Sequence, residues 1–300
     1  MKPARFDYAA PDTLGEAVSL LERHADDDVM ILAGGQSLVP LLNMRMARPE
    51  LLVDLNRIAE LQYIREDGEW LAIGAMTRKR AVEESDLVRR RQPALLAATR
   101  LVGHPQIRNR GTVGGSMAHA DPAAEYPALA LVLGAELRVV GPGGERSIAA
   151  DEFFKGYLMT AMEPVEILTE VRVPILAPGT GWSFVEVARR HGDFALGGAA
   201  ATVRLDASGS FSEVRIVLFG VSGAAVRLGG VEERLVGQRP GDALFREAGA
   251  TASEGLEEPL SDVHASAEYR RNLAGVLTIR ALGEAVARAG GREPGQEERR

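Results

Sequence analysis

The sequence predicts an α+β protein with two domains, and three observations support this prediction. The chain has 300 residues, which is about two domains at roughly 150 residues each. Residues 174–181 contain two prolines and two glycines, a composition typical of a linker. Beyond this linker the pattern changes to strands followed by helices only, which predicts a second domain of the α+β class with an antiparallel sheet.

The composition narrows the possible functions. The chain is 46% hydrophobic and 26% charged, so it can bury sizeable cores in the manner of a globular protein. It contains no cysteine, which excludes disulfides, zinc–thiolate sites, a thiol nucleophile and any iron–sulfur cluster held by its own thiolates. The net charge of −7 argues against nucleic acid as a partner, because nucleic-acid binding requires a basic surface.

The sequence also lacks signals for membranes and metals. The charged N-terminus has no apolar core behind it, so it does not resemble a signal peptide. The longest nearly apolar stretch, Pro127–Ala135, is far shorter than the roughly 20 residues of a membrane-spanning helix. The five histidines show no metal-ligand spacing. We therefore expect a cytoplasmic protein with no integral membrane segment and no metal site, in which the histidines have structural roles.

The first elements form a parallel unit. Thr13 and Glu16 make a capping box at the start of an amphipathic helix. The apolar run Val29–Leu32 predicts a buried strand, a helical pattern begins at Leu38, and Leu51–Leu55 predicts another strand. Two strands joined by a short helix within about 30 residues are typical of a parallel pair.

The middle of the chain alternates between the two kinds of element. We expect a strand at Trp70–Ala75, a helix that begins at Thr77 and another at about Pro93–Leu101. Residues 103–121 show neither helical nor strand periodicity and are predicted to be irregular. A short helix is expected at about Ala123–Leu133.

A hairpin and a final strand complete the first half. The hairpin consists of strands Glu136–Val140 and about Glu145–Ile148, joined by a turn of three glycines and a proline. The strand Ile167–Val173 follows and ends at Pro174, because proline cannot donate to the ladder.

The second half is predicted to contain three strands and then helices. The strands lie at Trp182–Ala188, Ala199–Leu205 and Val214–Phe219, and the longest helix spans about Ser266–Ala289. The polar and charged residues 290–300 are typical of a disordered tail.

Two glycine loops are the strongest candidates for a binding site. The loop Ala33–Ser37 lies between a strand and the start of a helix, where backbone N–H groups without helical partners can bind an anion. In the second loop, Gly114 and Gly115 lie between the hydroxyls of Thr112 and Ser116. Neither loop matches the dinucleotide fingerprint or the P-loop. The residues alone therefore leave two interpretations: the loops bind a ligand that carries phosphate, or they are ordinary turns without a ligand.

Other groups of residues leave more than one interpretation open. The adjacent carboxylates Asp151 and Glu152 fit a turn or a cap better than acid–base chemistry, and Phe153 and Trp182 fit the core. The segment 189–194 is either a solvated loop or a device that places Phe194 and charges over a cofactor.

On the last helix, Tyr269, Arg270 and Arg271 either anchor that helix or face a partner.

Six segments, in order along the chain, closely resemble the FAD-binding medium subunit of molybdenum hydroxylases, the flavoprotein of the carbon monoxide dehydrogenase, xanthine dehydrogenase and aldehyde oxidase family. The segments are Ile31–Leu42, Ile107–Ser116, Ala120–Pro122, Glu166–Leu168, Ala188–Ala195 and Ser266–Arg271. The resemblance extends over the chain to about residue 289.

The resemblance implies a two-lobed FAD-binding domain of the vanillyl-alcohol-oxidase-like (PCMH) type, followed by a smaller α+β domain with an antiparallel sheet and helices. We expect the first domain at residues 1–176, with lobes at about 1–56 and 57–176, and the second at 177–289. The implied FAD-binding residues are Leu32, Ala33, Gly34, Gly35, Gln36, Ser37, Leu38, Thr112, Gly114, Gly115, Ser116, Asp121, Glu125, Leu168 and Phe194.

The same resemblance implies an oxidoreductase subunit with no substrate-transforming residues of its own. Its FAD would pass electrons from [2Fe–2S] clusters on a small subunit to an external acceptor, while a large molybdopterin subunit oxidises the substrate. A dimer of such heterotrimers is the implied assembly. Two alternatives remain at this point: a free-standing FAD-dependent oxidase or dehydrogenase, and an interaction module without a cofactor.

Overall fold

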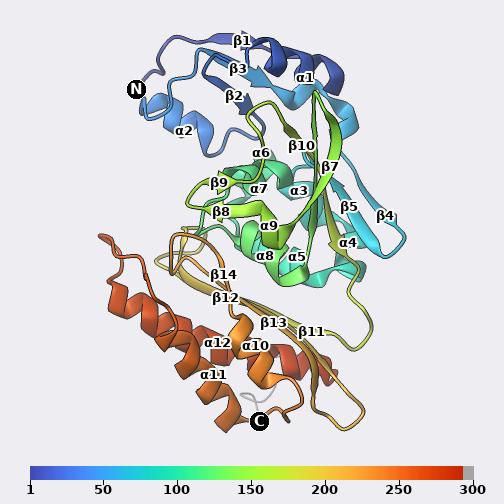
Figure 1. Cartoon of the computed structure of the whole chain (residues 1–300), viewed down its shortest axis with the longest axis vertical. Coiled ribbons are helices and arrows are strands. Elements are labelled where there is room, and N and C mark those ends of the chain that lie inside the picture. The colour runs from blue at the N-terminus through green and yellow to red at the C-terminus, as the bar shows by residue number, and fades with distance from the viewer. Residues whose placement is uncertain (293–300) are drawn as a thin grey trace.

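The computed structural model describes residues 1–292, which form three layers along the long axis of the molecule. Figure 1 shows the N-terminal lobe at one end, a mixed layer in the middle and the C-terminal sheet and helices at the other end. The predicted α+β class is confirmed. Most of the tail expected at 290–300 lies outside the described residues.

The N-terminal lobe is a three-stranded parallel sheet with two helices. Its elements are β1 (Asp7–Ala9), α1 (Leu14–Arg23), β2 (Val29–Leu32), α2 (Leu38–Asn43) and β3 (Leu51–Asp54). The strand order is β1-β3-β2, and β3 pairs in parallel with both neighbours, so the predicted parallel unit is confirmed. At α1 the Thr13 hydroxyl accepts from the Glu16 N–H at 3.2 Å, as predicted, whereas the Glu16 carboxylate accepts from the Asp12 N–H instead of the Thr13 N–H. Leu55, expected in the strand, begins the 3₁₀ turn η1 (Leu55–Arg57), which η2 (Ala59–Leu61) follows.

The middle layer contains a five-stranded antiparallel sheet in the order β4-β5-β10-β6-β7. Its strands are β4 (Ile64–Asp67), β5 (Trp70–Gly74), β6 (Glu136–Gly141), β7 (Gly144–Ala149) and β10 (Ile167–Pro174). The predicted hairpin is β6–β7, and the strand predicted before Pro174 is β10. Leu71, Ile73, Leu137 and Val171 are fully buried in one core with the helices, so one face of this sheet is covered.

The helices of the middle layer include four that the sequence pattern did not indicate. The helices are α3 (Lys79–Glu84), α4 (Asp86–Arg91), α5 (Pro93–Leu101), α6 (Pro105–Arg110), α7 (Val113–His119), α8 (Glu125–Leu133) and α9 (Ala150–Phe153), and the four are α4, α6, α7 and α9. The prediction of an irregular segment at 103–121 was wrong, because α6 and α7 lie within it. Pro105 begins α6 and the Thr112 side chain caps α7; both helices are shorter than the span over which helical periodicity becomes visible.

A small hairpin, β8 (Phe154–Gly156) and β9 (Met159–Thr160), lies beside the middle layer. Its tip carries three exposed apolar side chains, those of Tyr157, Leu158 and Met159. Leu158 has a φ of +54°, a conformation that non-glycine residues adopt rarely. The hairpin therefore presents apolar surface on a tightly turned backbone.

The C-terminal layer is an antiparallel sheet covered by helices, as predicted. Its elements are β11 (Gly181–Ala188), β12 (Ala195–Leu205), β13 (Phe211–Phe219), β14 (Val226–Arg227), α10 (Gly229–Leu235), α11 (Asp242–Glu254) and α12 (Ala267–Ala289). The expectation of helices only after the third strand needs one correction, since the two-residue strand β14 pairs with β13.

The C-terminal sheet lies between α12 on one face and the middle layer on the other (Figure 1). Val185 and Val187 pack into the core with α12, whereas Trp182 and Phe184 pack into the core of the middle layer. This division follows from the strand repeat, which points alternate side chains to opposite faces. Residues of β11 with even numbers therefore face the middle layer.

Candidate functional site

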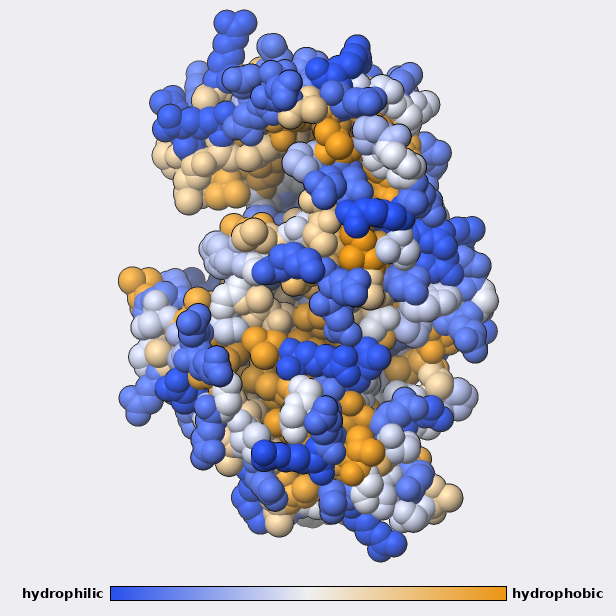
Figure 2. All heavy atoms as spheres, in the orientation of Figure 1, coloured by the Kyte–Doolittle hydropathy of each residue, from blue (hydrophilic) through white to orange (hydrophobic). Residues whose placement is uncertain are grey.

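A large cavity lies where the N-terminal lobe meets the middle layer. It has a volume of about 780 Å³, which is within the range of small-molecule and cofactor sites. Figure 2 shows a deep indentation between the lobe and the middle of the molecule, with hydrophobic residues along its edges. Both glycine loops, the start of α8, the hairpin β8–β9 and residues 192–194 of the C-terminal layer contribute to its wall.

The first glycine loop presents unpaired backbone donors to this cavity. Gly35 has a φ of +73°, which glycine adopts without strain. Within the described chain, the N–H groups of Gly35, Gln36 and Ser37 have no hydrogen-bond acceptor. The Asn56 side chain holds the loop from outside by donating to the Ala33 carbonyl at 2.9 Å. This loop can therefore bind the oxygens of an anion.

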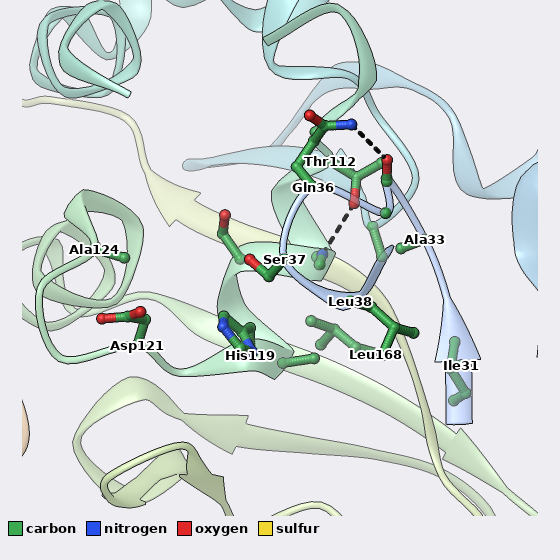
Figure 3. Close-up of a pocket in the computed structure, with 18 of the residues that line it drawn as sticks. Ile31, Ala33, Gln36, Ser37, Leu38, Thr112, His119, Asp121, Ala124 and Leu168 are labelled. Atoms are coloured by element: carbon green, nitrogen blue, oxygen red, sulfur yellow. Dashed lines mark hydrogen bonds between the residues drawn. The ribbon is translucent and has the colours of Figure 1, made fainter. Parts of the chain in front are cut away.

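The backbone donors of Gly114 and Gly115 in the second glycine loop are already paired within the protein. The Gly114 N–H donates to the Ala75 carbonyl at 2.8 Å, and the Gly115 N–H donates to the Thr112 hydroxyl at 3.1 Å (Figure 3). Thr112 is thus the cap of α7. The Ser116 side chain lies on the cavity wall, so this loop offers a hydroxyl where the first loop offers N–H groups.

Glycine is required in these loops because the loops contact other backbone segments. A Cβ on Gly34 would lie 2.5 Å from the Arg110 carbonyl oxygen and 2.7 Å from Gly111 Cα. A Cβ on Gly114 would lie 2.4 Å from Ala75 Cβ. The loops therefore fix the two sides of the cavity against each other, in addition to any role toward a ligand.

Charged groups gather at the start of α8. Asp121 and the buried Glu125 and Lys79 all line the cavity. Burial raises the pKa of the Glu125 carboxyl, and the positive charge of Lys79 partly offsets this rise. Burial also lowers the pKa of the Lys79 ammonium to about 8, and its Nζ lies 4.7 Å from the centre of the Tyr126 ring.

Apolar groups also line the cavity. Leu168 at the start of β10 is buried, whereas Phe194 and Leu158 are 61% and 41% exposed. The loop that carries Phe194 is held close to the middle layer, since a Cβ on Gly192 would lie 2.7 Å from the His104 ring. The cavity thus has an apolar rim that is open to solvent.

Fourteen of the fifteen residues that the resemblance implied line this one cavity: Ala33, Gly34, Gly35, Gln36, Ser37, Leu38, Thr112, Gly114, Gly115, Ser116, Asp121, Glu125, Leu168 and Phe194. Figure 3 shows Ser37, Thr112, His119 and Asp121 around the same space. Leu32 is the exception. It packs instead with the core cluster of Leu42, Ala47 and Leu52.

Several cavity residues were not identified from the sequence. Lys79 is one of three lysines in the chain, beside Lys2 and Lys155, and this rarity among many arginines was the signal available for it. His119, interpreted from the sequence as structural, lies on the cavity wall. No local pattern marks Leu158, which reaches the wall through the turn of the β8–β9 hairpin.

The structure shows what Arg270 and the adjacent carboxylates Asp151 and Glu152 contact. Arg270 is buried, donates to the carbonyls of Leu196 and Gly220 and pairs with Asp262 at 2.6 Å, so it anchors α12 to the C-terminal sheet. Asp151 and Glu152 lie in the first turn of α9, and Asp151 pairs with Arg227 at 3.1 Å.

The described residues contain no group of three or more histidine, aspartate or glutamate side chains that could hold a metal ion. Over residues 1–292, no helix is long and apolar enough to cross a bilayer.

Two family models match the chain. Residues 4–176 match the FAD-binding domain of molybdopterin dehydrogenases, and residues 182–285 match the C-terminal domain of the carbon monoxide dehydrogenase flavoprotein. The two matched segments correspond to the N-terminal and middle layers and to the C-terminal layer.

Similar proteins agree with these models over nearly the whole chain. The carbon monoxide dehydrogenase medium chain of Hydrogenophaga pseudoflava is 42% identical, over 96% of this chain and 99% of the relative. The 6-hydroxypseudooxynicotine dehydrogenase complex subunit alpha of Paenarthrobacter nicotinovorans is 43% identical, over 96% and 97%. A solved structure of the carbon monoxide dehydrogenase from Hydrogenophaga pseudoflava matches with a TM-score of 0.93 at 41% identity, over 96% of this chain and 99% of that one.

Proposed function

Since this chain belongs to the FAD-binding flavoprotein subunits of the molybdenum hydroxylases, we propose that it holds FAD in the cavity between its two glycine loops and passes electrons from a partner subunit to an external acceptor. The observation that supports this proposal best is the convergence of both loops on one cavity of about 780 Å³, although about 80 residues separate them in the sequence. FAD, when bound, supplies the electron-accepting and electron-donating chemistry through its isoalloxazine ring.

The residues present fit a dinucleotide that carries a pyrophosphate. The free N–H groups of Gly35, Gln36 and Ser37 are donors for phosphate oxygens, and Ser116 of the other loop lines the same cavity. The carboxylates of Asp121 and Glu125 are acceptors for sugar and ribityl hydroxyls. We propose that these residues hold the polar part of FAD.

The apolar part of the cavity fits a flat ring system. We propose that the backbone of Leu168 and the ring of Phe194 contact the isoalloxazine. Because Phe194 is 61% exposed, this end of the cavity is the one that a partner can approach.

The electrons must come from another chain, because this one contains no cysteine to hold a cluster. We propose a small [2Fe–2S] subunit as the donor and a large molybdopterin subunit as the site of substrate oxidation, assembled as a dimer of heterotrimers in the cytoplasm. The exposed Tyr157, Leu158 and Met159 at the hairpin tip adjoin the cavity rim and supply apolar surface for docking the donor.

Affinity purification of the tagged chain from its own cells tests this proposal. We expect FAD, molybdenum and iron to copurify, with about four iron atoms per FAD if two [2Fe–2S] clusters are present. Adding the oxidisable substrate of the complex without an acceptor should bleach the flavin absorbance. A chain that purifies alone and turns over a substrate by itself would instead support a free-standing FAD-dependent oxidase.

A further inference from the structure

The wall of the cavity carries several negative side chains and one ammonium group. Among the described residues that line it, Lys79 at the start of α3 is the only lysine or arginine, in a chain with 35 residues of these two kinds. Five carboxylates line the same cavity: Asp121, Glu125, Glu163, Glu166 and Asp193. An anionic ligand therefore meets a wall that is mostly negative, and Lys79 supplies the ammonium group that can balance it.

Lys79 is held in this wall by its backbone and by its aliphatic stem. Its N–H donates to the Gly111 carbonyl at 2.9 Å, and a Cβ on Gly111 would lie 3.6 Å from the Lys79 Cδ and 3.8 Å from its Cε. The first glycine loop contacts the same Gly111, since a Cβ on Gly34 would lie 2.7 Å from the Gly111 Cα. Lys79 and the loop that offers free N–H groups are therefore connected through one residue.

The ammonium group of Lys79 has a fixed position but no acceptor. Its Nζ lies 4.7 Å from the centre of the Tyr126 ring, and the Tyr126 hydroxyl lies 2.9 Å from the Thr99 hydroxyl, which holds the ring in place. Lys79 is 6% exposed, yet within residues 1–292 its side chain makes no hydrogen bond and no ion pair. A buried charge without a partner is costly, so a partner supplied by the ligand explains this position best.

The two glycine loops supply no positive charge of their own. The first loop offers neutral N–H groups and the second a hydroxyl, whereas a pyrophosphate is an anion. Glu166 of the wall is paired with Arg146 at 2.7 Å, but Arg146 is not among the residues that line the cavity. A lysine ammonium binds phosphate oxygens as a point charge, and this attraction is stronger in a cavity than in bulk water, because the effective dielectric constant is lower there.

We propose that Lys79 is a further binding residue of this site, whose ammonium donates to a phosphate oxygen of the bound dinucleotide and supplies the positive charge that the two loops lack. This inference rests on the proposed FAD site and adds to it a residue that lies outside both glycine loops and outside the six segments that resemble the family. The Tyr126 ring holds the ammonium in place, and the phosphate is the acceptor that the wall does not provide.

The test is a titration of the full chain, freed of flavin, with FAD in dilute buffer and again with added sodium chloride, monitored by the quenching of flavin fluorescence. We expect Lys79→Gln to raise the Kd at least ~10-fold in dilute buffer, because a charge-assisted hydrogen bond is lost. Salt screens the attraction between the ammonium and the phosphate, so the ratio of the variant Kd to the wild-type Kd should be smaller in high salt. Lys79→Met keeps the length of the stem and should raise the Kd in the same way.

The matched control is Lys155→Gln, which removes the same charge from an exposed lysine on β8 and should leave the Kd for FAD unchanged. Urea unfolding of each flavin-free chain separates binding from folding. Since the ammonium makes no hydrogen bond to the described residues, neither Lys79 variant should lower the urea midpoint. A lowered midpoint with an unchanged Kd would show a structural role and overturn the proposal.

A second measurement uses the wild-type chain and needs no variant. The lysines are acetylated with acetic anhydride, with and without saturating FAD, and each modified residue is quantified by mass spectrometry. We expect FAD to cause a loss of labelling at Lys79 and none at Lys155. Equal labelling of Lys79 in both samples, or a Kd ratio for Lys79→Gln that is the same in low and high salt, would overturn the role of Lys79 while leaving the FAD site in place. A wild-type chain that binds no FAD would instead overturn the proposed function.

Discussion

The contact between the two glycine loops makes Gly34→Ala a sharp test of how the cavity is built. An added Cβ would lie 2.5 Å from the Arg110 carbonyl oxygen and 2.7 Å from Gly111 Cα. Ordinary contacts of a Cβ begin at 3.4 Å, so the segments would have to separate by roughly 1 Å. Both atoms belong to the backbone, so no side-chain rotation can relieve the overlap. Overpacking of this kind costs about 1–3 kcal/mol.

The separation would widen the cavity between the N-terminal lobe and the middle layer. If the whole cost appears in binding, FAD affinity should fall roughly 5- to 150-fold, at tenfold per 1.4 kcal/mol. Titration with FAD measures this fall, and urea unfolding of the flavin-free chain measures how much of the cost appears in stability.

The matched control is Gly143→Ala in the β6–β7 turn, where an added Cβ meets no atom within 4 Å. It should leave both quantities within error of the wild type. If Gly34→Ala also binds FAD with wild-type affinity and unfolds at the wild-type urea concentration, the described contact between the loops is not important for the site.

Three further predictions concern Gly35 in the first glycine loop, Arg270, which anchors α12, and the partly buried acid Glu186. Gly35→Val places a branched residue at a φ of +73° and should abolish FAD retention in gel filtration while circular dichroism stays unchanged; normal flavin content would remove the loop from the site. Arg270→Met leaves the carbonyls of Leu196 and Gly220 without their donor, and should lower the free energy of unfolding by about 2–4 kcal/mol, whereas an unchanged urea midpoint would contradict the anchoring role. Burial raises the pKa of Glu186 from 4.5 to about 8, which means that its contribution to stability is full below pH 4.5 and is lost as the pH rises through 8. Glu186→Gln should therefore be more stable than the wild type above pH 8, by at most about 5 kcal/mol, and parallel pH profiles of unfolding for the two proteins would refute this.

Local patterns predicted the elements that follow simple rules. The run Val29–Leu32 is a strand with the predicted bounds, and the hairpin around residues 141–144 follows from its glycines and proline. The parallel pairing of β2 with β3 follows from the short helix between them. The segment 103–121 could not be predicted in this way, because α6 depends on a proline start and α7 depends on a threonine cap and on hydrogen bonds to the carbonyls of Ala75 and Thr77.

In the candidate site, too, some residues could be identified from local patterns and others could not. The two glycine loops stand out in the sequence, but their meeting in one cavity depends on how the N-terminal lobe packs on the middle layer. Lys79 and Leu158 carry no motif of their own. They reach the site or its wall through tertiary packing, which no local pattern encodes.

The central claim is that the two loops together hold a pyrophosphate, so the most direct measurement compares FAD with FMN, which has no pyrophosphate or adenosine. The flavin-free chain is titrated with each flavin at pH 7, and the Kd and the stoichiometry are determined. We expect one FAD per chain and an affinity for FMN that is lower by at least ~100-fold, or 2.7 kcal/mol. Equal binding of FMN and FAD, or no binding of FAD, would contradict the assignment of the cavity.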